Sequence, residues 1–209
     1  MRKIFDITNS QFSTIEVAKN LLGRKLISET PEGITTGWIV ETEAYLGVRD
    51  MAAHTYQWRK TPRVEAMYDK AGTIYIYNMM GNLLLNITTK EIGEPEAVLI
   101  RAVQPEKGIE LMEMRREKVG YELTNGPGKM TQAMGISMAE YGSSIIEPPL
   151  SIDFSTKREP KEIIKTPRIG IPNKEEWTEA PLRYIVKENP YVSRKRGQID
   201  LENYGWKYQ

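Results

Sequence analysis

The sequence predicts an α+β protein: a single domain over residues 1–209, with a curved, mostly antiparallel β-sheet surrounded by helices. Three observations lead to this prediction. The chain has 209 residues, which is enough for one domain with a sizeable core. Short strand patterns are interspersed with helix patterns, without the regular βαβ rhythm of a parallel sheet. The composition, 40% hydrophobic and 27% charged, is that of an ordinary globular protein.

The first part of the chain predicts one helix and then two strands. Residues 13–16 read Ser-Thr-Ile-Glu, a capping-box signature, and apolar residues recur at helical spacing up to Gly23, where the helix should end. Strand patterns at 25–28 and 34–45 are separated by a turn-forming Thr-Pro-Glu-Gly. This pair should form a hairpin.

The middle of the chain predicts a short helix, three strands and a longer helix. Thr61 suits an N-cap and Pro62 the first helical position. Strand patterns cover residues 73–79, 83–88 and 97–103, and an amphipathic helix is predicted from Pro105 to about Arg116.

The last part predicts one helix and then strands punctuated by proline. The segment Asn-Gly-Pro-Gly-Lys at 125–129 leads into a helix that continues through Met134 and is closed by Gly135. Strands are predicted at 150–154, 168–171 and 182–186, followed by a polar tail.

Composition excludes several classes of protein. No apolar run approaches the ~20 residues needed to cross a bilayer, and the first residues lack the apolar core of a secretion signal. The absence of cysteine fits a reducing compartment and excludes disulfides and thiol catalysis. A metal centre is disfavoured, because His54 is the only histidine and most zinc sites need several nitrogen or sulfur ligands. We expect a cytoplasmic monomer without metal, cofactor or membrane contact, associated with the nucleoid if the source is bacterial.

The net charge of +1 gives no bulk signal for nucleic acid, but basic residues are clustered. Each cluster can be an ordinary solvated face, or the clusters can together make one positive surface, and the sequence leaves both open. The clusters are Arg59, Lys60 and Arg63; Arg115, Arg116 and Lys118; Lys157, Arg158, Lys161, Lys165 and Arg168; and Arg194, Lys195 and Arg196.

The strand pattern at 39–45 has two different faces. Side chains alternate along a strand, so Glu41, Glu43 and Tyr45 point one way and the opposite face is mostly apolar. Two carboxylates and a phenol on one face are costly to bury. A short loop then delivers His54. These groups suit catalysis on, or capture of, a flat polar ring; the alternative is a solvated edge and a surface histidine, and the stretch alone does not decide.

Three further residues stand out on the neighbouring strand patterns. Tyr75 and Tyr77 share a face, which is usually core packing but can also hold a base taken out of a duplex. Asn86 is a polar residue inside an apolar strand.

Arg101 is the only charge in the apolar strand at 97–103. A buried arginine needs a carboxylate partner, and Glu43 or Glu41 is the natural candidate. At 125–129, Gly126, Gly128 and Lys129 begin a helix and offer backbone N–H groups and a positive charge, which suit a phosphate; an ordinary Gly/Pro turn explains them equally well.

Nine sequence blocks in order resemble the alkyladenine (3-methylpurine) DNA glycosylase family. They are IVETEAYLG, MAAHTY, TPR, GTIYIY, LLN, AVLIRAVQPEKG, NGPGKMTQAMGI, RIGI and PLRYIV, and they span most of the chain. The resemblance implies a monofunctional base-excision repair enzyme that flips a damaged purine out of double-stranded DNA. It would then hydrolyse the N-glycosidic bond without metal or cofactor. The substrate class would be 3-methyladenine, hypoxanthine and ethenoadenine.

The resemblance also implies roles for individual residues. Glu43 would activate the water, and Arg101 and the backbone near Ile171 would help to hold it. The base pocket would comprise Tyr45, His54 and Tyr77, with Asn86 as its gate. The family often has an aromatic wedge at the position of Met80, a role that methionine can also fill. The segment after Gly81 is a residue shorter than in the animal enzymes, so the register of Met79, Met80 and Asn82 against the wedge stays open.

The chemistry agrees with these implied roles. Cleavage of a glycosidic bond passes through an oxocarbenium-like transition state, which a nearby carboxylate stabilises while it deprotonates water. A cationic alkylated adenine also stacks well on electron-rich rings, at ~0.5–2 kcal/mol per contact. Two alternatives remain: a non-catalytic module that senses modified bases, and a hydrolase or transferase of small nucleosides that does not contact DNA.

Overall fold

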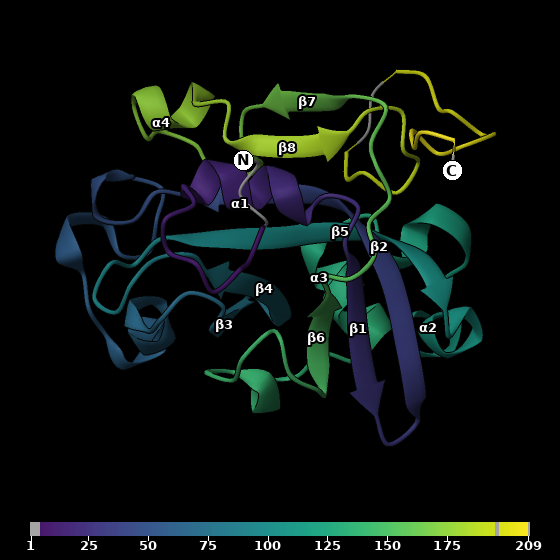
Figure 1. Cartoon of the computed structure of the whole chain (residues 1–209), viewed down its shortest axis with the longest axis horizontal. Coiled ribbons are helices and arrows are strands. Elements are labelled where there is room, and N and C mark those ends of the chain that lie inside the picture. Colours follow the sequence, from purple (N-terminus) through teal and green to yellow (C-terminus); the bar gives the residue numbers. More distant parts are fainter. Residues whose placement is uncertain (1–4, 195–196, 209) are drawn as a thin grey trace.

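A computed structural model describes residues 5–194 and 197–208 of the chain; Lys195 and Arg196 of the last basic cluster lie outside the described residues. One antiparallel sheet organises the molecule (Figure 1), and its strands follow the order β3-β4-β5-β2-β1-β6. The strands on this path are β1 Lys25–Thr30, β2 Gly33–Tyr45, β3 Ile74–Met79, β4 Asn82–Thr88, β5 Ala97–Lys107 and β6 Leu150–Asp153. The α+β prediction is confirmed.

The long strand β2 changes partner halfway along one edge. Its first half, residues 33–38, pairs with β1, and residues 41–43 pair with β8 Arg183–Val186. Strand β7 Ile163–Thr166 pairs with β8 and extends this branch (Figure 1). The pairing of β2 with β5 is irregular on both sides of Glu41, where the partner changes. Such irregularities redirect side chains, and this one lies at the two glutamates.

Short helices cover the sheet. Helix α1 Thr14–Leu21 packs on β2 and β5, and α3 Pro127–Met134 packs on β4 and β5 beside α2 Ile109–Arg116. The predicted capping box of Ser13 and Glu16 is present in α1. The remaining helices are α4 Glu176–Glu179 and the 3-10 helices η1 Gly47–Arg49, η2 Tyr56–Trp58, η3 Pro62–Tyr68, η4 Gly120–Leu123 and η5 Met138–Glu140.

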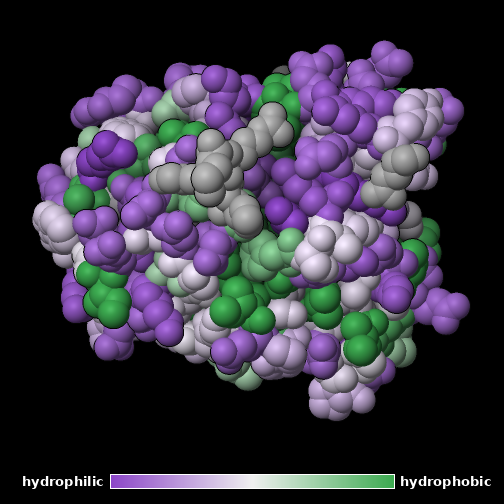
Figure 2. All heavy atoms as spheres, viewed as in Figure 1, coloured by the Kyte–Doolittle hydropathy of each residue, from purple (hydrophilic) through white to green (hydrophobic). Residues whose placement is uncertain are grey.

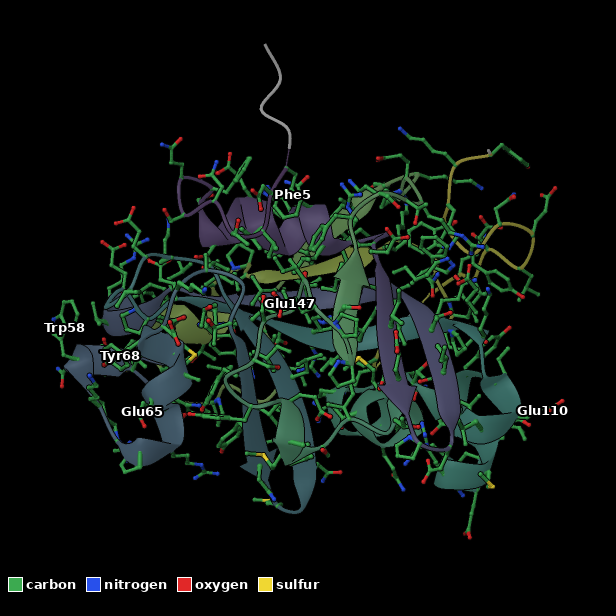
Figure 3. The ribbon with its side chains drawn as sticks, turned by 60° about the horizontal axis from the view of Figure 1, so that its bottom comes forward. Phe5, Trp58, Glu65, Tyr68, Glu110 and Glu147 are labelled. Atoms are coloured by element: carbon green, nitrogen blue, oxygen red, sulfur yellow. The ribbon has the colours of Figure 1, made fainter. Side chains whose placement is uncertain are left out.

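The core and the surface have ordinary character. Buried aliphatic side chains such as Leu21, Ile39 and Ile100 form one cluster between sheet and helices. The face in Figure 2 is largely hydrophilic, with apolar residues in small scattered groups. In Figure 3, Trp58 and Tyr68 lie at one end of the molecule, and Glu110 lies at the other. Among the described residues no helix is long and apolar enough to cross a membrane.

The structure corrects one predicted helix start. The helix predicted from Pro105 begins only at Ile109, and Pro105 lies inside β5, which continues to Lys107. Strand β4 pairs with β5 only along residues 97–99, so the missing N–H of Pro105 interrupts no bond on that edge. Gly108, with φ 71°, then turns the chain into α2.

A second correction concerns the strand predicted at 168–171. Those residues form a loop after β7, because Gly170 has φ 78°, which a continuing strand does not adopt. Strand β7 and helix α4 were not predicted. Thr61 does precede η3, but its side chain makes no capping hydrogen bond.

Candidate active site

A cavity of about 1010 Å³ opens where β2, β3, β4 and β5 meet the loops around residues 121–129, 169–171 and 190–194. Volumes of a few hundred to a thousand Å³ are typical of ligand sites. Most of the side chains selected from the sequence line it: Tyr45, His54, Tyr75, Tyr77, Asn86 and Arg101. The prediction that Tyr75 and Tyr77 share one face of a strand is thereby confirmed, and Met79 lines the cavity with them.

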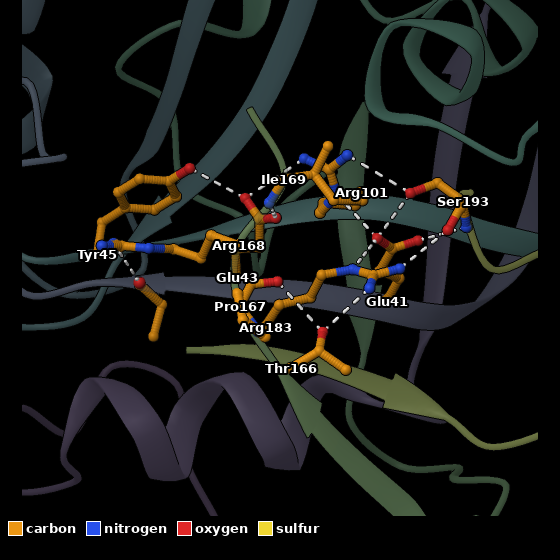
Figure 4. A network of polar contacts seen from close by, with 11 residues as sticks. Glu41, Glu43, Tyr45, Arg101, Thr166, Pro167, Arg168, Ile169, Arg183 and Ser193 are labelled. Atoms are coloured by element: carbon orange, nitrogen blue, oxygen red, sulfur yellow. Dashed lines mark hydrogen bonds and ion pairs between the residues drawn. The ribbon is translucent and has the colours of Figure 1, made fainter. Parts of the chain in front are cut away.

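Glu43 lies directly behind the cavity wall, with its side chain fully buried (Figure 4). Its Oε1 accepts a hydrogen bond from the backbone N–H of Ile169 at 2.8 Å. Its Oε2 accepts one from the hydroxyl of Tyr45 at 2.9 Å and lies 3.3 Å from Nη1 of Arg101. All three partners line the cavity. A carboxylate has about four acceptor positions, so these two hydrogen bonds and the ion pair leave at least one on Glu43.

Glu41 is equally buried but has a different set of partners. Its Oε1 accepts hydrogen bonds from Nε of Arg101 at 2.8 Å, from Nε of Arg183 at 2.7 Å and from Oγ of Ser193 at 2.7 Å. Its Oε2 accepts the backbone N–H of Ser193 at 2.6 Å. Oε1 thus accepts three of these bonds and Oε2 accepts one. Two guanidinium groups are bound to Glu41, whereas one is bound to Glu43.

Arg101 joins the two glutamates, as its lone position in an apolar strand predicts. One edge of the guanidinium contacts Glu41 and the other contacts Glu43. Burial alone would lower the pKa of Arg101, but the charges of Glu43 and then Glu41 outweigh it and raise that pKa. Two carboxylates, Arg101 and Arg183 thus form a buried cluster without net charge.

A second buried ion pair holds the loop that contacts Glu43. Nη2 of Arg168 donates to Oδ1 of Asp50 at 2.9 Å, and Nη1 donates to the backbone oxygen of Ala44 at 3.0 Å. The guanidinium also lies 4.6 Å from the ring centroid of Tyr45. Arg168 thereby fixes the backbone next to Ile169, whose N–H binds Glu43.

The hydroxyl of Tyr45 is a hydrogen-bond donor to Glu43. Burial, and then the charge of Glu43, raises the pKa of this hydroxyl well above its ordinary value. Tyr45 is therefore protonated at neutral pH.

The aromatic wall is formed by His54, Tyr75 and Tyr77. Nδ1 of His54 lies 2.9 Å from the hydroxyl of Tyr75, and the imidazole ring lies 4.2 Å from the ring of Tyr77. Burial, and then the charges of Arg63 and Arg59, lowers the pKa of His54, so the imidazole is neutral at neutral pH. His54 thus adds a polar edge to the wall without a positive charge at neutral pH.

Asn86 lies in β4 opposite Tyr75 of β3. Its Nδ2 donates to the backbone oxygens of Tyr75 and Leu84, each at 3.2 Å. Both amide protons are therefore engaged, and the side chain is fixed in one orientation at the cavity wall.

Met80 forms the tip of the β3–β4 hairpin. Met79 pairs with Asn82, and the two residues between them have φ 50° and 82°, both positive as in a type I′ turn. A methionine with positive φ is uncommon and costs about 1–3 kcal/mol. Its side chain is 96% exposed, so a strained backbone holds an apolar side chain in solvent.

The segment proposed for phosphate lies beside this hairpin. A Cβ on Gly128 would come within 2.7 Å of Oδ1 of Asn82, so Gly128 permits the close approach of the hairpin to α3. Nζ of Lys129 is paired with Glu122 at 2.5 Å. Gly126 and Lys129 line the cavity; Gly128 is not part of its lining.

Sequence reasoning did not single out Asp50, Arg183 or Ser193, and it noted Arg168 only as part of a charge cluster. A signal existed for two of them: Asp50 lies in the short loop after the strand that carries Glu-Thr-Glu, and Arg168 precedes an apolar Ile-Gly-Ile. Ser193 gave no signal. The described residues contain no group of three or more His, Cys, Asp or Glu side chains that could hold a metal ion.

Comparisons with known proteins agree with the site. The family model described as methylpurine-DNA glycosylase (MPG) matches residues 8–190. A protein of Enterococcus faecalis named "Putative 3-methyladenine DNA glycosylase" is 50% identical over 209 residues, covering 99% of this chain and 91% of the relative. Proteins with the same name from Lactiplantibacillus plantarum and Staphylococcus aureus are 50% and 52% identical, covering 94% and 88% of this chain and 95% and 91% of the relatives.

The match covers far more than half of the chain and includes the strand that carries Glu43. The chain belongs to the methylpurine-DNA glycosylase family, and it is a hydrolase of N-glycosidic bonds in DNA.

Proposed function

We propose that this enzyme removes alkylated and deaminated purines, of the 3-methyladenine, hypoxanthine and ethenoadenine class, from double-stranded DNA with a water activated by Glu43. It acts as a monomer, through the single domain 1–209, and without metal or cofactor. The damaged nucleotide is flipped out of the duplex into the cavity.

The observation that carries this proposal is the set of partners of Glu43. Three donors hold the carboxylate beside the cavity and leave one acceptor position for a water. Because the carboxylate is already held in one orientation, the catalytic group does not have to reorient when the substrate binds. The negative charge of Glu43 also stabilises the positive charge that develops on the sugar in the transition state.

In this proposal Arg101 and the loop at 169–171 hold the same water. Arg101 lines the cavity and also contacts Glu43. Ile169, Gly170 and Ile171 line the adjoining wall. The guanidinium donates hydrogen bonds but cannot take a proton from the water. It therefore orients a water while leaving deprotonation to the carboxylate.

The base lies between aromatic groups. Tyr45, His54 and Tyr77 offer ring faces and edges in the cavity, and stacking on such rings is worth ~1–3 kcal/mol per base. Asn86 adds a fixed polar group at the wall. Met80 fills the stack that the flipped nucleotide leaves, and Gly126, Gly128 and Lys129 contact phosphates.

Glu43→Gln tests the proposal directly. The amide keeps the volume but removes the charge and the proton acceptor, so base release should fall by several orders of magnitude while lesion binding is retained. The assay is single-turnover release from duplexes carrying 3-methyladenine, hypoxanthine or ethenoadenine, read by alkaline cleavage of the abasic site. Glu147→Gln, at an exposed position away from the cavity, is the matched control.

Each outcome decides between functions. Retention of more than a tenth of the wild-type rate by Glu43→Gln would assign the water to another group. Wild-type binding without base release would favour the sensing module. Release from free nucleosides but not from duplexes would favour the small-nucleoside hydrolase.

A further inference from the structure

Glu41 is a buried charge that the proposed mechanism does not use. It is fully buried, makes no contact with the cavity, and accepts four hydrogen bonds from Arg101, Arg183 and Ser193. These partners belong to β5, β8 and the segment that follows β8, so one carboxylate connects three parts of the chain to β2.

Stability alone does not explain such a residue. Burying an ion pair costs desolvation that its attraction often only repays, and apolar packing of the same volume is frequently as stable. A fully satisfied polar network does something that apolar packing cannot, because it fixes the orientation of each group in it. Glu41 therefore orients one or more of the side chains that are bound to it.

The geometry points to Arg101. The guanidinium is planar and rigid, so fixing Nε on Glu41 at 2.8 Å determines where its other nitrogens point. One of them, Nη1, lies 3.3 Å from Glu43, and Nη2 lies 3.4 Å from Oγ of Ser193. Figure 4 shows Arg101 between the two carboxylates, with Ser193 beyond it.

Glu41 also holds one wall of the cavity. Both the backbone N–H and the hydroxyl of Ser193 donate to it, and Nη2 of Arg183 donates to the backbone oxygen of Ser193 at 2.9 Å. Ser193 and its neighbours Val192 and Arg194 line the cavity. The same carboxylate thus sets the position of Arg101 and of the wall opposite Glu43.

We propose that Glu41 is a positioning residue for the reaction: it holds Arg101 in the orientation in which this arginine can share a water with Glu43, without itself touching the substrate. This inference rests on the proposed function of Arg101 and Glu43. It assigns different roles to two glutamates that the sequence places on one face.

The first test is Glu41→Gln. The amide faces either the two arginines or the backbone N–H of Ser193 with a donor in place of an acceptor, and in both orientations it lacks the negative charge that holds the guanidinium of Arg101. We expect the single-turnover rate at saturating enzyme to fall about 10- to 100-fold, as for a misplacement of about 1 Å. Binding to uncleaved lesion duplex should change less than about threefold. Equal losses in binding and rate would overturn the proposal.

The matched control is Thr42→Val. Thr42 lies between the two glutamates but points to the other face, where its hydroxyl donates to the backbone oxygen of Ala18 at 2.8 Å. The variant loses a buried hydrogen bond in the same strand without touching Arg101. Its melting temperature should fall while its rate stays at the wild-type value. A rate loss equal to that of Glu41→Gln would show that any damage to β2 suffices.

Two further sets of variants test the same role of Glu41. Glu41→Asp keeps the negative charge but moves it away from Arg101 by the length of one methylene group. It also supplies a folded variant if Glu41→Gln does not fold. A wild-type rate in Glu41→Asp would overturn the proposal. In an Arg101→Lys background, Glu41→Gln should cause a much smaller loss of rate than in the wild-type background, because its main effect is on Arg101. Additive losses would contradict this.

A readout that needs no activity separates this inference from the proposed function. The Nε–H resonance of Arg101 in ¹⁵N NMR should be protected from exchange in the wild type and lose that protection in Glu41→Gln. An unchanged resonance would refute the positioning role. Absence of base release by the wild type would instead refute the proposed function and leave this spectroscopic result standing.

Discussion

Glu41 and Glu43 are the same residue type on the same face of one strand, and only their partners distinguish them. Glu43 is bound by three groups that line the cavity, and Glu41 accepts four hydrogen bonds from Arg101, Arg183 and Ser193. The sequence could indicate that a carboxylate here has a task, because two buried charges in a row are costly. It could not show which one, since Arg183 and Ser193 lie far away in the chain.

Asn86 gives a prediction at the same scale. Both of its amide protons are held by backbone oxygens, so the side chain cannot turn away from a base that carries an extra amino group. Exclusion of guanine by a fixed group is a way to reject an abundant competitor. Asn86→Ala should therefore raise release of guanine or 1-methylguanine relative to hypoxanthine, while overall activity falls modestly.

The measurement for Asn86 is release of each base from matched oligonucleotides by wild type and variant. The ratio within one enzyme cancels changes in folded fraction. An unchanged ratio would leave Asn86 as a hydrogen bonder between β3 and β4.

The elements were predicted best where local chemistry decides them. The capping box of α1 and the glycine that ends α3 depend on neighbouring residues alone, and both are present. Pro105 was misassigned because its tolerance in β5 depends on β4 ending earlier, which is a property of the whole sheet. The loop at 168–171 looked like a strand because its apolar pattern does not reveal that Ile169 uses its N–H to bind Glu43.

The β3–β4 hairpin gives a prediction for an element. Its tip presents Met80 to solvent from a strained backbone, as expected of a side chain that fills a vacated base stack. Met80→Ala should weaken binding to lesion DNA more than it slows bond cleavage. The reason is that the wedge contributes to flipping and not to the charge on the sugar.

Equilibrium binding and single-turnover release, measured side by side, check this. Met138→Ala, an exposed methionine of η5 outside the cavity lining, is the control. Unchanged or tighter binding by Met80→Ala would show that Met80 does not contact the DNA. The wedge would then have to be Met79 or Asn82.

At the scale of the molecule, the sheet brings distant segments to one cavity. Residues selected from the sequence at 43–54, 75–86 and 101 converge there, as the predicted curved antiparallel sheet allows. The wall at 190–194 was not predicted, because the branch through β8 that positions it departs from the sequential hairpins.

Metal independence is a prediction for the whole chain. One histidine and no cysteine leave too few ligands for a catalytic zinc, and the buried carboxylates 41 and 43 are already bound by arginines. Activity should survive EDTA and should not rise with added Mg²⁺ or Zn²⁺. Loss of turnover in the chelator, with rescue by one divalent ion, would overturn the proposed mechanism.

The change of partner along β2 has a consequence for how activity arises during protein synthesis. The strand that carries Glu43 is translated early, but the edge beside it stays open until β8 pairs with residues 41–43, and Glu41 has its full set of partners only when Ser193 arrives. In a chain that is still being translated, Glu41 therefore lacks its bonds from Ser193 until residue 193 has been made, and residues 41–43 of β2 have no partner on this edge until β8 has been made.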